Sequence, residues 1–160
     1  MEEDKKANGS FEELSLKDNL LRGIYSYGFE VPSAIQSSAI PVMKSGKDVI
    51  AQAQSGTGKT GAFVIGSLEK VDPEIEGTQI IIISPTRELS KQTTEVVTEL
   101  GKYMKISYLE VVGGTDIFQC RSDLDKLPQV VIGTPGRILD MINKRSLFTD
   151  KLTTLIFDEA

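Results

Sequence analysis

The segment from Ala53 to Thr60 constrains the fold of this chain more than any other feature. It reads Ala-Gln-Ser-Gly-Thr-Gly-Lys-Thr, the pattern of a phosphate-binding loop in which Ala53 replaces the usual first glycine. An apolar run at 49–51 precedes it, and a stretch with helical spacing, 59–70, follows. Such a loop joins a buried strand to the N-terminus of a helix, where inward-turned amides and the helix dipole attract phosphate. We therefore expect a strand–loop–helix unit that binds a nucleoside triphosphate.

The rest of the chain repeats this alternation. Short apolar runs that are continuous rather than alternating predict strands covered on both faces, at 49–51, 80–83, 109–112, 130–132 and 155–157. Helical spacing falls between them, at 59–70, 87–104, 116–126 and 136–144. The predicted fold class is α/β, with a parallel twisted sheet and helices on both faces. Right-handed crossovers bring the carboxyl ends of all its strands to one edge, where ligands bind.

Two further helices are predicted ahead of the loop. Ser15 has the spacing of a capping box with Asp18, which predicts a helix from there to about Gly28. A second helix is expected after Pro32, closing near Gly46. Residues 1–10 are polar and are expected to form a flexible tail.

Composition narrows the functional classes. The 160 residues match one domain, and no apolar run approaches a membrane span or a signal peptide. A single cysteine, Cys120, and the lack of histidine argue against disulfides and zinc, and favour a reducing, intracellular compartment. The net charge of −5 argues against a broad basic face. Any nucleic acid would therefore be held by a few cationic side chains, backbone amides and helix N-termini.

Two other segments suggest how a nucleotide would be used. Asp158 and Glu159 follow the apolar run 155–157, so Asp158 is expected to bind Mg²⁺ through water and Glu159 to orient and deprotonate an attacking water. Upstream, Gln36 has an amide that could pair with adenine, and Phe29 has a ring that could stack on it. From the residues alone, the segment 28–36 also fits an ordinary junction between two helices.

Seven short motifs, taken in order, resemble the first RecA-like domain of the DEAD-box ATP-dependent RNA helicases. They are Phe11, Gly28 to Gln36, the loop at 53–60, Pro85-Thr86-Arg87-Glu88-Leu89, Gly113-Gly114, Thr134-Pro135-Gly136-Arg137 and Asp158-Glu159-Ala160. The connecting sequence is most similar to the branch of eukaryotic initiation factor 4A. The resemblance implies a RecA-like P-loop domain over 11–160, C-terminally truncated, with the family's second RecA-like domain absent.

The resemblance also implies a role for each matching residue. Lys59, Asp158 and Glu159 would be catalytic, and Mg²⁺ would be held by Thr60 and, through water, by Asp158. ATP would be bound by Phe29, Gln36, Ser55, Gly56, Thr57, Gly58, Lys59, Thr60 and Gly61. RNA would be contacted, independently of its sequence, by Pro85, Thr86, Arg87, Gly113, Gly114, Thr134, Pro135, Gly136 and Arg137. Without the resemblance, surface ion pairs are a second, less favoured interpretation of Arg87 and Arg137.

The function implied is the ATP-binding lobe of an RNA helicase that remodels RNA or locally unwinds it in translation initiation, in a cytoplasmic monomer with scaffold-type partners. A helicase of ribosome biogenesis or of the exon-junction type, nuclear or nucleolar, is an alternative. A nucleotide-controlled protein-binding scaffold is another, and a kinase or GTPase would share only the phosphate-binding loop. Without a second lobe and its arginine finger, we expect the isolated chain to bind ATP or ADP weakly and to hydrolyse almost none.

Overall fold

The computed structural model describes residues 9–159. Most of the expected tail, 1–8, and Ala160 lie outside the described residues. The described chain forms two compact units, one of residues 9–70 with 99–103 and the other of residues 71–98 with 104–159. The phosphate-binding loop belongs to the first unit, and the pair Asp158-Glu159 to the second.

The first unit is helical around the loop. It contains the short 3-10 helix η1 (Glu12–Leu14) and the helices α1 (Asp18–Tyr27), α2 (Ala34–Lys44) and α3 (Lys59–Leu68), of which α2 and α3 pack together. Its core consists of fully buried apolar side chains from each part, among them Phe11, Leu20, Ile24, Ile40, Val64, Ile65 and Leu68. Phe11 is therefore a packing residue.

The predicted capping box at Ser15 is wrong. Ser15 has a left-handed backbone, with φ of 53°, and its N–H donates to Glu12 O to close η1. An N-cap residue needs an extended backbone, so Ser15 cannot serve as one. α1 instead begins at Asp18 after Lys17, which makes no side-chain cap, and it ends at Gly28 as predicted. A capping box does occur at the start of α2, between Ser33 and Gln36.

The predicted strand at 49–51 is also wrong. The segment has no regular structure, and Ile50 is fully exposed. A strand depends on a neighbour that pairs with its backbone and covers its side chains. No strand pairs with 49–51 within the described chain, so its apolar residues stay in solvent.

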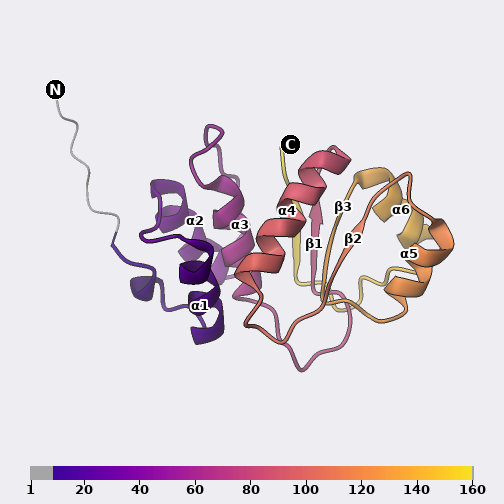
Figure 1. The fold of residues 1–160 in the computed structure, drawn as a ribbon, viewed down its shortest axis with the longest axis horizontal. Helices are drawn as coiled ribbons and strands as arrows, with labels where there is room; N and C mark the ends of the chain where they lie inside the picture. Colours follow the sequence, from indigo (N-terminus) through magenta and orange to yellow (C-terminus); the bar gives the residue numbers. More distant parts are fainter. Residues whose placement is uncertain (1–8, 160) are drawn as a thin grey trace. The chain divides into compact units, whose positions relative to one another are not determined.

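The second unit contains the sheet (Figure 1). Its strands are β1 (Ile80–Ile83), β2 (Tyr108–Val111), β3 (Val130–Gly133) and β4 (Thr154–Phe157), in the order β2-β3-β1-β4. All three strand pairings are parallel, as predicted. Consecutive strands along the chain are connected by the helices α4 (Arg87–Leu100), α5 (Ile117–Leu124) and α6 (Pro135–Asn143). Four of the five predicted strands are thus present within one residue of their expected bounds.

Helices cover both faces of this sheet. On one face Ile81 and Val131 are in register and pack in a cluster with Cys120 and Leu124 of α5 and Met141 of α6. On the other face Glu110 is in register with Ile132, and its carboxylate accepts hydrogen bonds from Ser90 and Thr94 of α4. The doubly covered α/β arrangement is therefore confirmed.

Strand β4 lies at one end of the sheet. In the described part of the chain it pairs only with β1, and Leu155 and Phe157 are 48% and 61% exposed. Both belong to the face of Ile81, since Leu155 is in register with it. The cover over that face therefore stops short of β4. Among residues 9–159, no helix is both long and apolar enough to cross a membrane.

Candidate nucleotide and RNA sites

The phosphate-binding loop has the backbone shape that its glycines predict. Gly56 and Gly58 have φ of 82° and 88°, the left-handed region that favours glycine, and Gly58 caps the N-terminus of α3. Thr57 closes the turn, since its N–H and its hydroxyl both donate to Gln54 O at 3.3 and 2.6 Å. Lys59 and Thr60 form the first turn of the helix. An N-terminus of this kind attracts phosphate through its free amides and its dipole.

Gln36 joins the upstream motif to this loop. Its side chain is 2% exposed, and its amide nitrogen donates to Gly58 O at 3.2 Å. Its amide oxygen accepts from Ser33 N at 2.9 Å. A glutamine amide has two N–H donors and an oxygen with two lone pairs, so one donor and one lone pair remain for a nucleotide base. The capping box thus holds Gln36 in a fixed position against the loop.

Glycine is needed at two positions because the Gln36 side chain lies close to the backbone of the loop and of α3. A Cβ on Gly58 would lie 2.7 Å from the Gln36 amide nitrogen and 2.8 Å from the Ser33 hydroxyl. A Cβ on Gly61 would lie 2.8 Å from the same nitrogen and 3.1 Å from the Phe29 ring. A Cβ on Gly56 would meet nothing within 4 Å. The loop therefore requires Gly56 for its backbone angle, Gly61 for space, and Gly58 for both.

Phe29 belongs to a group of four aromatic rings. It stacks on Phe11 with 6.3 Å between centroids, and Tyr27 meets it edge-on at 4.9 Å. Tyr25 meets Phe11 edge-on at 6.2 Å. The Tyr25 hydroxyl donates a hydrogen bond to the Glu12 carboxylate, which raises the pKa of Tyr25 to about 12 and lowers the pKa of Glu12. These contacts fix the ring that the sequence assigned to adenine.

Hydrogen bonds connect the three predicted RNA motifs in the second unit. Arg87 donates from Nη1 to Gly113 O at 3.1 Å, and Gly113 N donates to the Thr134 hydroxyl at 3.4 Å. Thr134 N donates to Val111 O at 3.1 Å. Pro85 and Thr86 follow β1 after one intervening residue, Ser84, and Pro135 and Gly136 begin α6. The motifs thus meet at the carboxyl ends of the strands, as a parallel sheet requires, and we call this group the strand-end edge.

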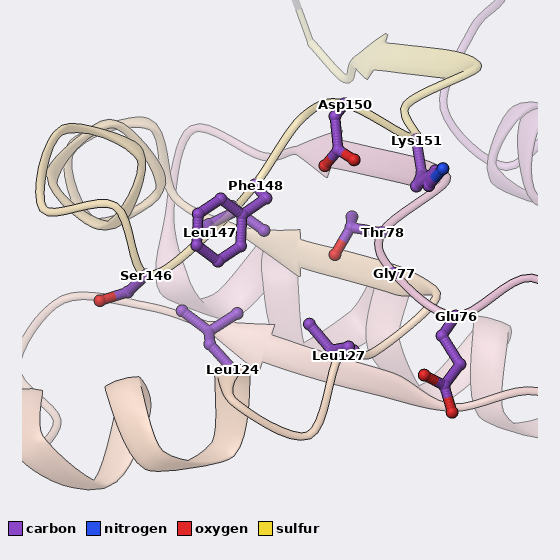
Figure 2. A pocket seen from close by; sticks show the side chains of 10 residues that line it. All are labelled: Glu76, Gly77, Thr78, Leu124, Leu127, Ser146, Leu147, Phe148, Asp150 and Lys151. Carbon is purple, nitrogen blue, oxygen red and sulfur yellow. The ribbon is translucent and has the colours of Figure 1, made fainter.

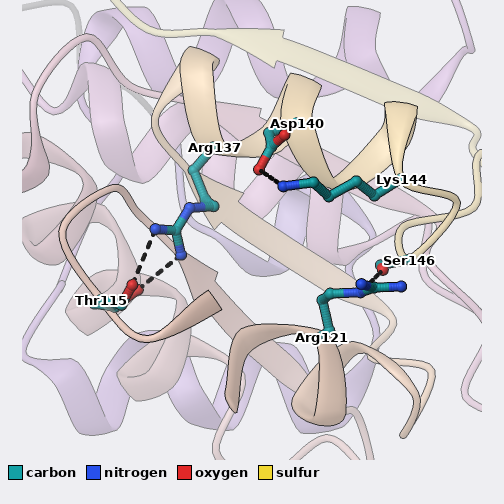
Figure 3. Close-up of polar contacts among 6 residues, drawn as sticks. All are labelled: Thr115, Arg121, Arg137, Asp140, Lys144 and Ser146. Atoms are coloured by element: carbon teal, nitrogen blue, oxygen red, sulfur yellow. Dashed lines mark hydrogen bonds and ion pairs between the residues drawn. The ribbon is translucent and has the colours of Figure 1, made fainter. Parts of the chain in front are cut away.

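Arg137 fixes the loop that follows Gly114. Its guanidinium donates to the Thr115 hydroxyl at 3.1 Å and to Thr115 O at 3.0 Å (Figure 3). Both arginines therefore hold backbone loops, and within residues 9–159 neither forms the surface ion pair that was the alternative. A guanidinium has five N–H donors, so each arginine keeps donors for a phosphate. Thr115 was not among the predicted site residues, since a threonine after a Gly-Gly turn carries no distinctive signal.

The helix N-termini at this edge are not equivalent. The Asp116 carboxylate accepts from Phe118 N and Gln119 N and so occupies the start of α5 with negative charge. The Thr86 hydroxyl accepts from Leu89 N at the start of α4. Thr134 makes no side-chain cap on α6 within the described chain. The start of α6 therefore offers backbone amides to an anion at this edge.

Asp158 and Glu159 directly follow β4. The Asp158 N–H donates to Ile83 O at 2.9 Å, which extends the pairing with β1 by one residue. Glu159 has φ of 57°, a left-handed backbone that is uncommon for a residue with a side chain. Such conformations cluster at functional sites, where surrounding structure holds them.

A glycine-rich loop at the start of a helix, a buried glutamine against it and an acidic pair after a parallel strand are the pattern of a P-loop α/β protein. A family model described as DEAD/DEAH box helicase matches residues 33–160. The chain belongs to this family.

Curated relatives are similar over almost the whole chain. The ATP-dependent RNA helicase eIF4A of Neosartorya fischeri is 53% identical over 94% of the chain and 38% of its own length. The ATP-dependent RNA helicase fal1 of Schizosaccharomyces pombe is 52% identical over 99% of the chain and 40% of its own length. The chain thus spans about two fifths of the length of these relatives.

Solved structures of the family have the same fold. S. cerevisiae Dbp5 bound to RNA and ADP BeF3 superposes with a TM-score of 0.87 at 40% identity, covering 94% of this chain and 38% of that one. A DEAD box protein from Methanococcus jannaschii gives 0.88 at 38% identity, covering 94% and 41%. The predicted RecA-like fold is confirmed.

Proposed function

We propose that this chain is the ATP-binding lobe of an ATP-dependent RNA helicase, which remodels RNA or locally unwinds it. The observation that carries the proposal is the set of hydrogen bonds from Arg87 to Gly113 and from Gly113 to Thr134. They bring three separate motifs to one edge, an arrangement that a small-molecule kinase or a GTPase does not need. The names of the relatives above support the same activity.

On the nucleotide side, each predicted residue keeps its proposed role. Phe29 would stack on adenine and Gln36 would use its remaining donor and lone pair on the base edge, while 55–61 would hold the phosphates. Hydroxyl and carboxylate oxygens are ligands that Mg²⁺ prefers, so Thr60 and Asp158, the latter through water, fit that ion. Mg²⁺ neutralises phosphate charge in such sites. Lys59 would add positive charge at the β and γ phosphates, and Glu159 would orient and deprotonate the attacking water.

On the RNA side, the strand-end edge would bind phosphates through the amides at the start of α6 and through the free donors of Arg87 and Arg137. None of these groups selects a base, so binding would be independent of sequence and weakened by salt. This matches a chain of net charge −5, which has no need of a broad basic surface.

The pathway is proposed from the names of relatives. A role in translation initiation is supported by the eIF4A relatives and would place the protein in the cytoplasm. Relatives named fal1 have the same level of identity, so a role as a nuclear or nucleolar helicase is the alternative. A nucleotide-controlled scaffold is the remaining alternative.

The decisive experiment is RNA-stimulated ATP hydrolysis by the full-length protein that contains this chain. Wild type should hydrolyse ATP faster with single-stranded RNA, and Lys59→Ala and Glu159→Gln should each lower the rate by at least about 100-fold. Exposed Lys91→Ala on α4 is the control and should behave as wild type. Hydrolysis that neither substitution changes would contradict the proposal, and nucleotide binding without any hydrolysis would favour the scaffold.

A further inference from the structure

We propose that the amino-terminal edge of the sheet carries a second binding site, which takes a basic protein segment with an apolar anchor. The site is a cavity of about 410 Å³ in the second unit (Figure 2). Its lining comes from the segment 76–78, from Leu124 and Leu127, and from 146–148 with 150–151. The proposal is independent of the helicase function, since no residue of the nucleotide or RNA motifs contributes.

The location follows from the strand order. Thr78 lies just before β1, Leu127 just before β3 and Lys151 just before β4. In a parallel sheet, the segments that enter the strands lie at the edge opposite to the segments that leave them. The cavity is therefore at the opposite end of the strands from Arg87 and Thr134. A partner here would leave the strand-end edge free for RNA.

Buried amides make the walls of this cavity rigid. Gln129 is buried, and its amide nitrogen donates to Pro73 O and Ile75 O at 3.1 and 3.0 Å. Gln79 is also buried and donates to Asp72 O and Ile75 O at 2.8 and 3.1 Å. The two side chains hold the loop 72–77 against the sheet. The Thr78 hydroxyl donates to Pro128 O at 2.7 Å and joins that loop to the turn before β3.

Apolar side chains in the cavity remain open to solvent. Phe148 is 53% exposed and Leu127 is also exposed, while Leu124 and Leu147 form a buried floor. Leu127 has φ of 55°, a left-handed backbone that is a clear outlier for a leucine. Its N–H donates to Leu124 O at 3.0 Å, which holds it there. An exposed leucine and phenylalanine beside an apolar floor form a pocket for one apolar side chain.

Carboxylates beside the pocket indicate the charge of the segment that would bind there. The loop 72–77 carries three carboxylates, on Asp72, Glu74 and Glu76, and no basic residue, and Asp150 adds a fourth. Among residues 9–159, neither Glu76 nor Asp150 has a salt bridge. Lys151 is the one cation in the lining, and its methylene groups lie against Gly77. On the side of loop 72–77 carboxylates therefore outnumber cations. The other side is basic, since Arg121 donates to the hydroxyl of the lining residue Ser146, and Lys126 and Arg145 directly precede Leu127 and Ser146. A segment whose Lys or Arg faces loop 72–77 beside its apolar anchor is complementary to this arrangement.

The test is a binding titration with a defined probe. The probe is a synthetic peptide whose central Leu-Phe pair is flanked by two arginines on each side, with a fluorophore at one end. One control peptide has the Leu-Phe pair replaced by serines, and a second has the arginines replaced by glutamates. We expect the probe to bind the chain in the micromolar range, more weakly as salt rises, and both controls to bind at least about tenfold more weakly.

Variants locate the binding on the protein. Phe148→Ala should weaken the probe at least about fivefold, and Glu76→Lys with Asp150→Lys should weaken it by a similar factor. The matched controls are Phe118→Ala, an exposed phenylalanine (77%) outside the cavity, and Glu95→Lys, an exposed carboxylate on α4. Both should bind the probe as wild type does. Amide chemical shifts should change at Gly77, Thr78 and Phe148, which reports the site even if affinity changes little.

Several outcomes would overturn the proposal. Equal losses in Phe148→Ala and Phe118→Ala would mean non-specific apolar binding. Equal affinity for the acidic control peptide would remove the argument from charge. Shifts at Gly77 and Phe148 that depend on protein concentration without peptide would show that a second copy of the chain occupies the pocket. No binding at millimolar peptide would leave the cavity without the proposed partner.

Discussion

Gln36 and Arg87 make the same kind of contact in the two units of this molecule. Each donates from its side chain to a backbone carbonyl of another motif, Gln36 to Gly58 at 3.2 Å and Arg87 to Gly113 at 3.1 Å. Gln36 is 2% exposed, whereas Arg87 is exposed to solvent. Loss of a buried partner leaves an unsatisfied polar group, whereas water replaces an exposed one. Two hydrogen bonds of similar length are therefore expected to differ in how much their loss destabilises the fold. Substitutions around Gln36 and the phosphate-binding loop should lower the free energy of unfolding far more than substitutions at the strand-end edge.

The largest effect should come from filling the space beside Gln36. Gly58→Ala places a Cβ against the Gln36 amide and forces alanine to φ of 88°, so we expect a loss of at least about 2–3 kcal/mol in unfolding free energy. ATP binding should fall with it. Gly56→Ala has similar backbone strain at 82° without crowding, and should cost about 1 kcal/mol. Urea unfolding and calorimetric titration with ATP measure both, and equal costs for the pair would show that crowding is unimportant.

Removing the buried amide should have the next largest effect. Gln36→Ala loses the bonds to Ser33 N and Gly58 O, so we expect a cost of about 1–3 kcal/mol and a weaker preference for ATP over GTP. In Gln36→Glu the side chain can still accept from Ser33 N, but it places a carboxylate oxygen against Gly58 O, so the bond to Gly58 is lost. Exposed Gln54→Ala is the control and should stay within about 0.5 kcal/mol of wild type. If Gln36→Ala were as stable as this control, the buried bond of Gln36 would matter no more to stability than the exposed bond of Arg87.

At the strand-end edge we expect binding to change while stability does not. Arg87→Ala should alter unfolding free energy by no more than about 0.5 kcal/mol, because water replaces the lost bond. Affinity for single-stranded RNA should fall about tenfold, and the salt dependence should lose about one phosphate contact. Fluorescence anisotropy at several salt concentrations measures both quantities. Arg145→Ala, at the opposite edge of the sheet, should bind RNA normally.

The smallest effect concerns the exposed pair Glu12 and Tyr25, which support the aromatic group. The pKa of Tyr25 is raised from 10.0 to about 12, so the folded state holds the proton more tightly and this stabilisation is lost as pH rises above 10. The pKa of Glu12 is lowered from 4.5, so its contribution is lost as pH falls below that value. Tyr25→Phe should flatten both limbs of a plot of urea midpoint against pH. An unchanged plot would contradict the hydrogen bond.

The parts of the structure that the sequence predicted are those set by local pattern. Continuous apolar runs located β1, β3 and β4 closely, and the glycine pattern located the loop and the start of α3. The run at 49–51 looked the same, but a strand also needs a neighbour, and local pattern does not supply one. The capping box was predicted at Ser15 from spacing alone. The residue type also matters, because a capping box needs Glu or Gln three residues on, which Ser33 has in Gln36 and Ser15 lacks, since its partner is Asp18.

The site residues were chosen for their chemistry, and the structure adds their partners. The bond between Gln36 and Gly58 joins positions far apart in the sequence, and so does the bond between Arg137 and Thr115. No local signal predicts such a pairing, since any donor within reach of a free carbonyl would serve. The cavity with Phe148 was likewise missed, because its lining comes from segments that carry no recognisable motif.

Strand β4 has a consequence for how this chain behaves at high concentration. Among residues 9–159 no strand pairs with its outer edge, and Leu155 and Phe157 are exposed beside it. An uncovered strand of this kind is a template on which another chain can add a strand of its own. Preparations of the chain should therefore tend toward aggregation, and Leu155→Lys should keep them dispersed.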